Sequence, residues 1–125
     1  MRTLLLSAFA CTLALGAVPA QAAQNRCGLL DNPTPGNWWL TDRDGEWTIG
    51  VQMGHQAEGM ENMPESLFEK GWVRTNGFYG YRCACLSVDT DPATHRVTMV
   101  HSAKALPMSR CKADKALQKV IRETH

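Results

Sequence analysis

The stretch Phe78-Tyr79-Gly80-Tyr81-Arg82-Cys83-Ala84-Cys85-Leu86-Ser87-Val88-Asp89 is the longest strand candidate in this 125-residue chain. Successive side chains of a strand point to opposite faces. One face would carry Phe78, Gly80, Ala84, Leu86 and Val88, and the other would carry Tyr79, Tyr81, Cys83 and Cys85. Both faces are suited to burial, which is typical of a central strand covered on both sides. Arg82 interrupts the apolar face and therefore needs a partner or a bulge.

Shorter strand candidates lie on either side of this segment. Residues 38–42 and 46–52 read as a hairpin around the turn Arg43-Asp44-Gly45. Residues 72–75 form a short strand candidate before the tight-turn dipeptide Asn76-Gly77, and residues 95–102 are expected to return after the central strand. The pattern predicts a sheet with mainly antiparallel pairing.

Helical patterns are few and short. Pro64 and Gly71 bound one short helical turn, and Ser109 is a candidate N-cap for a carboxyl-terminal helix that starts near Cys111. Residues 23–37 read as an extended or looped arm, because 32–36 are rich in turn residues. The sequence therefore predicts an α+β fold, a small mainly antiparallel sheet with one or two short helices, stapled by two disulfides.

Residues 1–22 have the pattern of a secretory signal peptide. Arg2 supplies a positive start, residues 4–18 are almost wholly apolar, and Ala20-Gln21-Ala22 is a small-x-small cleavage site. The apolar run is shorter than the roughly 20 residues that span a bilayer. We therefore expect residues 23–125 to form a single small disulfide-stabilised domain, periplasmic or secreted, with no membrane association after cleavage.

Four cysteines remain after the predicted cleavage: Cys27, Cys83, Cys85 and Cys111. An even number in an exported chain predicts a disulfide framework. Cys83 and Cys85 lie side by side on one face of a strand, so a bridge between them would be strained. Cys27 and Cys111 are then expected to take one each, in an order that the spacing leaves open. The alternatives are a thiol-redox centre and a thiolate metal site with His101.

Composition limits the kind of partner. Without Arg2, the thirteen Lys and Arg become twelve, which equal the twelve Asp and Glu. A chain without net charge is not expected to bind nucleic acid through bulk electrostatics. The expected partners are an envelope or secreted protein or a glycan.

Two groups of residues are candidates for a functional surface. Trp38 and Trp39, with Tyr79 and Tyr81, are the candidate binding surface, because exposed aromatic side chains mark interaction sites. Weak candidate ligands for Cu(I) are Met53, His55, Met60 and Met63, whose thioether and imidazole groups suit that ion. No hydrolase, metalloprotease, P-loop or dinucleotide-binding motif occurs, so the sequence names no catalytic residue and no cofactor.

Three blocks of this sequence resemble a bacterial exported family called domain of unknown function 4087. The blocks are Cys27-Gly28 with residues 31–40 and 42–47, then residues 75–85, then residues 101–107 with Ser109-Arg110-Cys111. The resemblance covers nearly all of the mature chain. It implies an exported, single-domain protein with four cysteines and supplies no catalytic residues.

The function that the sequence favours is therefore an exported binding or interaction module without catalytic activity. The two alternatives are a periplasmic copper-handling protein and a thiol-redox protein. Size, export, predicted rigidity and the lack of a catalytic motif favour the first.

Overall fold

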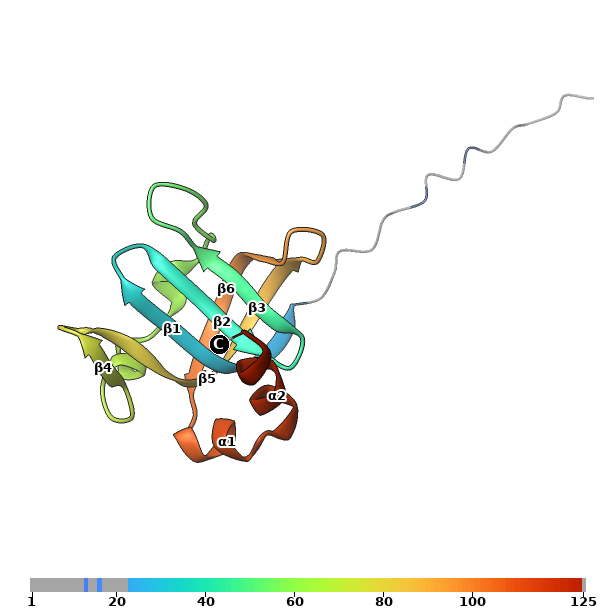
Figure 1. The fold of residues 1–125 in the computed structure, drawn as a ribbon. Coiled ribbons are helices and arrows are strands. Elements are labelled where there is room, and N and C mark those ends of the chain that lie inside the picture. Colours follow the sequence, from blue (N-terminus) through green and yellow to red (C-terminus); the bar gives the residue numbers. More distant parts are fainter. Residues whose placement is uncertain (1–12, 14–15, 17–22, 125) are drawn as a thin grey trace, which may run out of the picture.

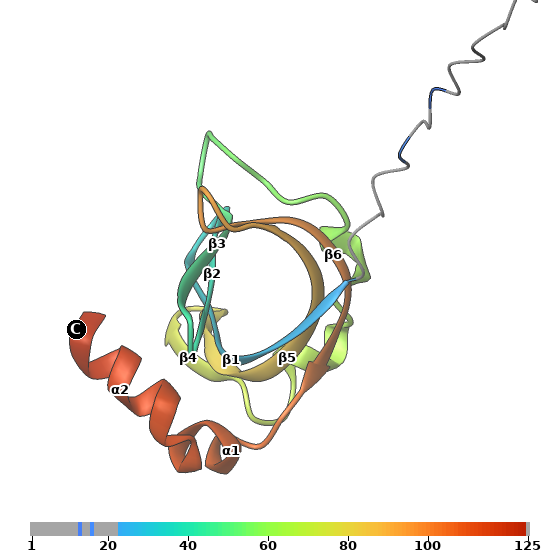
Figure 2. The same ribbon diagram turned by 90° about the vertical axis from the view of Figure 1, so that its right-hand side faces the viewer.

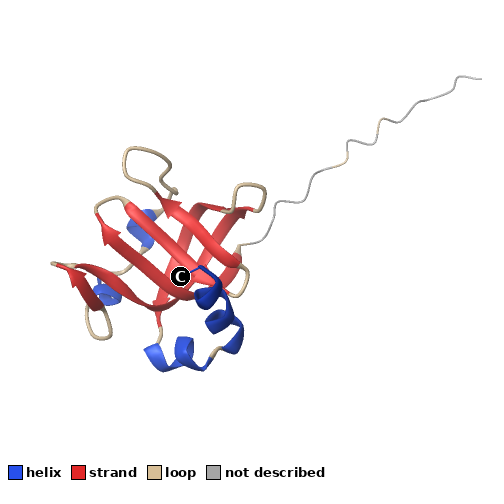
Figure 3. Cartoon of the chain, in the orientation of Figure 1, coloured by secondary structure: helices blue, strands red, loops and turns tan. Residues whose placement is uncertain are grey.

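The computed structural model describes Leu13, Gly16 and residues 23–124. The predicted signal peptide lies outside the described residues apart from Leu13 and Gly16, and it stays a prediction. One sheet contains six strands, coloured red in Figure 3: β1 (Gln24–Thr34), β2 (Asn37–Asp42), β3 (Gly45–Gly50), β4 (Val73–Asn76), β5 (Tyr79–Asp91) and β6 (Arg96–Ala105). Two 3-10 helices, η1 (Met60–Asn62) and η2 (Glu65–Phe68), precede β4, and two α-helices, α1 (Met108–Ala113) and α2 (Lys115–Thr124), follow β6. The predicted α+β class with a mainly antiparallel sheet, short helices and two disulfides is confirmed.

The sheet closes into a barrel because β1, the first strand in the order of the sheet, pairs with β2 and also with β5 (Figures 1 and 2). The same residue, Leu30, is opposite Leu40 of β2 on one edge and Arg82 of β5 on the other. With β4 set aside, the strands follow one another around the ring as β1-β2-β3-β6-β5 and back to β1. This is the strand order of an OB-fold, a five-stranded, partly open Greek-key barrel.

The barrel is incompletely closed between β3 and β6. These strands are parallel and share the single register pair Thr48 and Arg96. Residues 56–58 fill the opening: the Ala57 amide donates to the Ile49 carbonyl at 2.9 Å, and the Glu58 amide donates to the Thr98 carbonyl at 3.0 Å. The short segment after β3 therefore completes the wall.

Apolar side chains fill the barrel and a second, smaller cluster lies outside it. The interior contains the buried residues Leu30, Leu40, Trp47, Ile49, Ala57, Leu67, Ala84, Leu86, Val88, Val97 and Val100. The outer cluster consists of Cys83, Cys111 and Leu117, with Leu29, Leu106, Met108 and Ile121 packed against them. The two faces of β5 are thus buried in different places, one in the barrel and the other beneath α1 and α2.

The two disulfides differ in exposure. Cys27 lies directly opposite Cys85 in the β1–β5 ladder and is bonded to it, and Cys27 is exposed. Cys83 is bonded to Cys111 of α1, and both of these are buried, at 1% and 4% exposure. The expectation that Cys27 and Cys111 bind one residue each of the Cys83–Cys85 pair is confirmed.

The arm at residues 23–37, expected to be extended or looped, is a strand over most of its length, and the expected single carboxyl-terminal helix is wrong because two helices are present. Residues 24–34 form β1, in which Pro33 falls where the β1–β2 register shifts, so its missing N–H leaves the regular ladder intact. The final helix is interrupted at Asp114, whose Oδ1 accepts hydrogen bonds from the amides of Ala116 and Leu117. A side chain that caps a new helix in this way separates α1 from α2.

Gly28 allows β2 to cross close to β1. A Cβ atom at this position would overlap the carbonyl group of Thr41. We expect Gly28→Ala to lower the free energy of unfolding by about 2 kcal/mol, since a crowded core must shift backbone to accept the methyl group. Urea denaturation measures the loss. Asn25→Ala, at an exposed position of the same strand, is the control, and equal stability of the two variants would contradict the close-crossing account.

The difference in exposure also predicts the order in which the disulfides open. A reducing thiol reaches Cys27 from solvent, whereas Cys83 and Cys111 are buried among apolar side chains that include those of α1 and α2. In a dithiothreitol titration read by alkylation and peptide mapping, Cys27 and Cys85 should be labelled first. Simultaneous labelling of all four cysteines would contradict this order.

Candidate functional site

β4 projects from the barrel (Figure 1), and exposed apolar side chains lie on and beside it in the sequence. Within residues 23–124 the large exposed apolar residues are Met53, Phe68, Val73 and Phe78, and three of these four fall between residues 68 and 78. Phe78 is 81% exposed. We call this surface the aromatic patch and define it as Trp38, Phe68, Trp72, Val73 and Phe78.

Three rings of the aromatic patch, those of Trp38, Phe68 and Trp72, contact one another. The ring of Phe68 meets Trp38 and Trp72 edge to face, with ring centroids 6.0 and 5.1 Å apart. The Trp72 indole donates to the Phe78 carbonyl at 3.0 Å, and the Arg74 guanidinium lies 4.9 Å from the Phe78 ring centroid. Edge-to-face pairs and cation–π contacts are favourable arrangements for aromatic rings. The patch is therefore ordered as well as exposed.

Arg82 fixes the segment that carries the patch. Its side chain is buried on β5 and donates to the carbonyls of Leu67, Lys70 and Leu106 at 3.0 to 3.1 Å, and Nε donates to the carbonyl of Cys83. These bonds join η2 and the following turn to β5 and to the end of β6. Burial lowers the pKa of Arg82 from its usual value, because water is replaced by neutral carbonyl groups. The sequence predicts a partner or a bulge for Arg82, and the structure shows that this partner is a set of main-chain carbonyl oxygens.

The sequence-based surface and the observed patch overlap at one residue. Trp38 is half-buried, packs against the core and touches Phe68. Trp39, Tyr79 and Tyr81 are also half-buried, and they make none of the ring contacts of the patch that are described above. Sequence reasoning missed Phe68, Trp72 and Phe78. The sequence did indicate this region through its high local frequency of aromatic residues, since five of the nine occur between positions 68 and 81.

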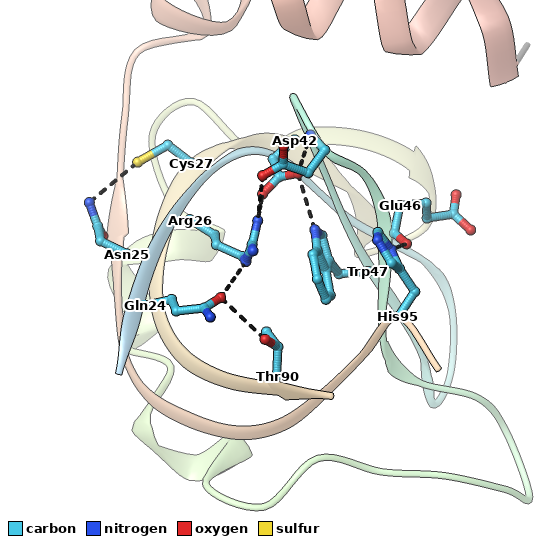
Figure 4. Close-up of polar contacts among 10 residues, drawn as sticks. Gln24, Asn25, Arg26, Cys27, Asp42, Glu46, Trp47, Thr90 and His95 are labelled. Carbon is cyan, nitrogen blue, oxygen red and sulfur yellow. Dashed lines mark hydrogen bonds and ion pairs between the residues drawn. The ribbon is translucent and has the colours of Figure 1, made fainter. Parts of the chain in front are cut away.

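The opposite end of the barrel holds a polar cluster (Figure 4). The start of β1, the β2–β3 turn and the β5–β6 turn meet there. Trp47 is stacked between two side chains: the Arg26 guanidinium lies 4.0 Å from its ring centroid, and the His95 ring is parallel to it at 3.8 Å. Asp42, which is 3% exposed, accepts from Arg26 at 2.8 Å and from the Trp47 indole at 3.1 Å.

The positive charge of Arg26 in this cluster is balanced by the carboxylates of Asp42 and Asp44. Burial by itself lowers the pKa of Arg26, but its bonds to Asp42 and Asp44 outweigh burial and raise that pKa above the usual value. The Arg26–Asp44 bond is 3.0 Å long. Arg26 therefore carries its charge throughout the physiological range. A pocket of about 430 Å³ opens beside the cluster, lined by Gln24, Asn25, Arg26, Cys27, Asp42, Arg43, Asp44 and Asp114.

The candidate copper ligands lie in different environments. Met53 is fully exposed in the turn after β3, whereas Met60 and Met63 pack against the barrel core. His55 uses Nε2 in a 2.8 Å hydrogen bond with the Val97 carbonyl. His101, the candidate partner of the thiolates, lies beside Asp89, with its Nε2 3.0 Å from the Asp89 Oδ1. Among the described residues, no three or more His, Cys, Asp or Glu side chains are grouped to hold a metal ion.

We expect Arg82→Leu to destabilise the protein by about 3 kcal/mol, because it leaves several buried carbonyl oxygens without a donor. Urea denaturation gives the stability. Amide hydrogen exchange of residues 67–72 should rise more than that of β2, since those residues lose their attachment to β5. Arg122→Leu, at an exposed position of α2, is the control. Unchanged exchange at residues 67–72 would contradict the anchoring role of Arg82.

Comparison with known proteins gives one assignment. A family model described as "Protein of unknown function (DUF4087)" matches residues 21–118. No curated protein and no solved structure matches the chain. No helix among the described residues has the length and apolar character needed to cross a bilayer. The three sequence blocks, the four paired cysteines and the family model agree, and the chain belongs to the DUF4087 family.

Proposed function

We propose that this protein is an exported binding module, in the periplasm or outside the cell, that docks onto another envelope or secreted protein through the aromatic patch. The observation that carries the proposal is the concentration of exposed apolar side chains at residues 68–78. The predicted signal peptide and the two disulfides support an oxidising compartment outside the cytoplasm.

The chemistry of the patch fits a protein partner. Protein interfaces are enriched in Trp, Phe and Arg, and a few such residues provide most of the binding energy. Phe78 offers an anchor with Arg74 against its ring. Because Arg82 holds the backbone of residues 67–70 and the Phe68 and Trp72 rings contact each other, the entropy lost by these residues on docking is reduced.

Side-chain docking fits this end of the barrel better than addition of a strand to β4. β4 has four residues, contains Arg74 and loses its register with β5 between Arg74 and Asn76. Short length, positive charge and irregular pairing are features that keep edge strands from joining other chains.

The two alternative functions have less support. Copper handling needs converging sulfur and nitrogen ligands, and Met53, His55, Met60 and Met63 are divided between the surface, a main-chain hydrogen bond and the core. Thiol-redox chemistry needs an accessible thiolate, and all four cysteines after residue 22 are bonded in pairs.

A photo-crosslinking residue tests the docking surface directly. We expect p-benzoylphenylalanine at position 78, in protein exported by its own cell, to give one discrete protein adduct on irradiation. The same residue at position 53 is the matched control, because Met53 is apolar and fully exposed but lies outside the patch. Denaturing gels and mass spectrometry identify the adduct.

Three outcomes would contradict the proposal. The first is the same set of adducts at positions 53 and 78, which would indicate nonspecific contact. The second is no adduct at position 78. The third is an adduct that resists protease and is removed by glycosidases, which would make the partner a glycan.

A further inference from the structure

We propose that the pocket beside Arg26 binds a small uncharged sugar. This site lies at the opposite end of β1 from the aromatic patch: Gln24 lines the pocket, whereas Asn32 is paired with Gly80 next to β4. The inference does not depend on the proposed protein partner.

The pocket has the size and position of a ligand site. Its volume of about 430 Å³ falls within the range of small-molecule sites, roughly 300–1,000 Å³. Its walls come from three separate parts of the chain: the first residues of β1, the β2–β3 turn and the junction of α1 with α2. A site assembled from distant segments is held by the whole fold.

Two polar side chains of the pocket wall, Gln24 and Arg26, are fixed before any ligand arrives. Arg26 is held by Asp42, by Asp44 and, through Nε, by Gln24 Oε1 at 2.9 Å. Gln24 Oε1 also accepts from the Thr90 hydroxyl at 3.2 Å. Trp47 supports the guanidinium from one side (Figure 4). Such preorganisation reduces the entropy lost on binding.

Hydrogen-bonding capacity of both kinds remains at the pocket. Since the Gln24 oxygen already accepts two bonds, its NH₂ group is the part left to donate, and the bonds of Arg26 to Gln24, Asp42 and Asp44 use only Nε and Nη1. Asp114 accepts its two capping bonds with Oδ1, which leaves Oδ2 as an acceptor. Arg43 is exposed at the pocket edge.

The presence of both hydrogen-bond donors and acceptors at the pocket favours a ligand with hydroxyl groups over a charged ligand. A hydroxyl both donates and accepts, so neighbouring hydroxyls of a sugar use donors and acceptors that lie side by side. Two arginines and three aspartates line the pocket, and Arg26 is already neutralised by Asp42 and Asp44. Neither a phosphate nor a free ammonium group would find a large excess of opposite charge. Cys27, with its disulfide, adds a less polar surface against which ring C–H groups can pack.

The test is an NMR titration of the exported protein with D-glucose, D-galactose, N-acetyl-D-glucosamine and maltose as probes. We expect at least one sugar to produce saturable shifts of the Gln24 side-chain NH₂ and Arg26 Nε signals. Arg43→Ala and Asp114→Asn should each weaken binding about tenfold, the effect of losing one charge-assisted hydrogen bond. Asparagine keeps the helix cap at position 114 while removing its charge.

Controls separate this site from the aromatic patch and from general destabilisation. Arg122→Ala removes an exposed arginine outside the pocket, and Phe78→Ala alters the aromatic patch. Both should bind the sugar as tightly as the unchanged protein, and thermal unfolding confirms that every variant is folded. Absence of shifts with all four sugars, full affinity in Arg43→Ala and Asp114→Asn, or tighter binding of glycine or phosphate at the same signals would each overturn the proposal.

Discussion

Strand β5 is the element on which the rest of the structure depends, because it pairs with three other strands. β1 follows one of its edges, and β4 and then β6 follow the other. Cys83 and Cys85 leave from its outer face, and Arg82 leaves from its inner face. Both disulfides, the attachment of the aromatic patch and part of the pairing that closes the barrel therefore depend on residues 80–85.

Arg82 and Arg26 lie at the two ends of the barrel in different surroundings, and their pKa values shift in opposite directions. Arg82 is surrounded by neutral carbonyl groups, which satisfy its hydrogen bonds without balancing its charge, and its pKa falls. Arg26 has two carboxylates, and its pKa rises. The first organises a surface of aromatic rings and the second organises a polar pocket. A fold of this class is compatible with many functions, so the function must be inferred from the sites at these two ends.

Local sequence patterns predicted those elements whose partners are near in the chain. The hairpin around Gly45, the short turn after Pro64 and the central strand all follow from spacing and turn residues. Residues 23–37 were left as an extended or looped arm, because β1 is stabilised by β5, whose paired residues lie 48 to 64 positions away, and because it ends among turn residues. The polar cluster was missed for a similar reason: Arg26, Trp47 and His95 meet only once the barrel has closed.

The placement of Cys83 and Cys85 has a consequence for how the oxidised chain selects its structure. The two thiols are two residues apart on one face, so sliding β1 by two residues along β5 would bring Cys27 opposite Cys83 while every side chain kept its inward or outward direction. Hydrophobic patterning alone discriminates poorly between such registers. The covalent link from Cys27 to Cys85 excludes the slipped pairing, and the link from Cys83 to Cys111 removes the competing thiol. Oxidation thus fixes the strand alignment for as long as the two disulfides stay intact.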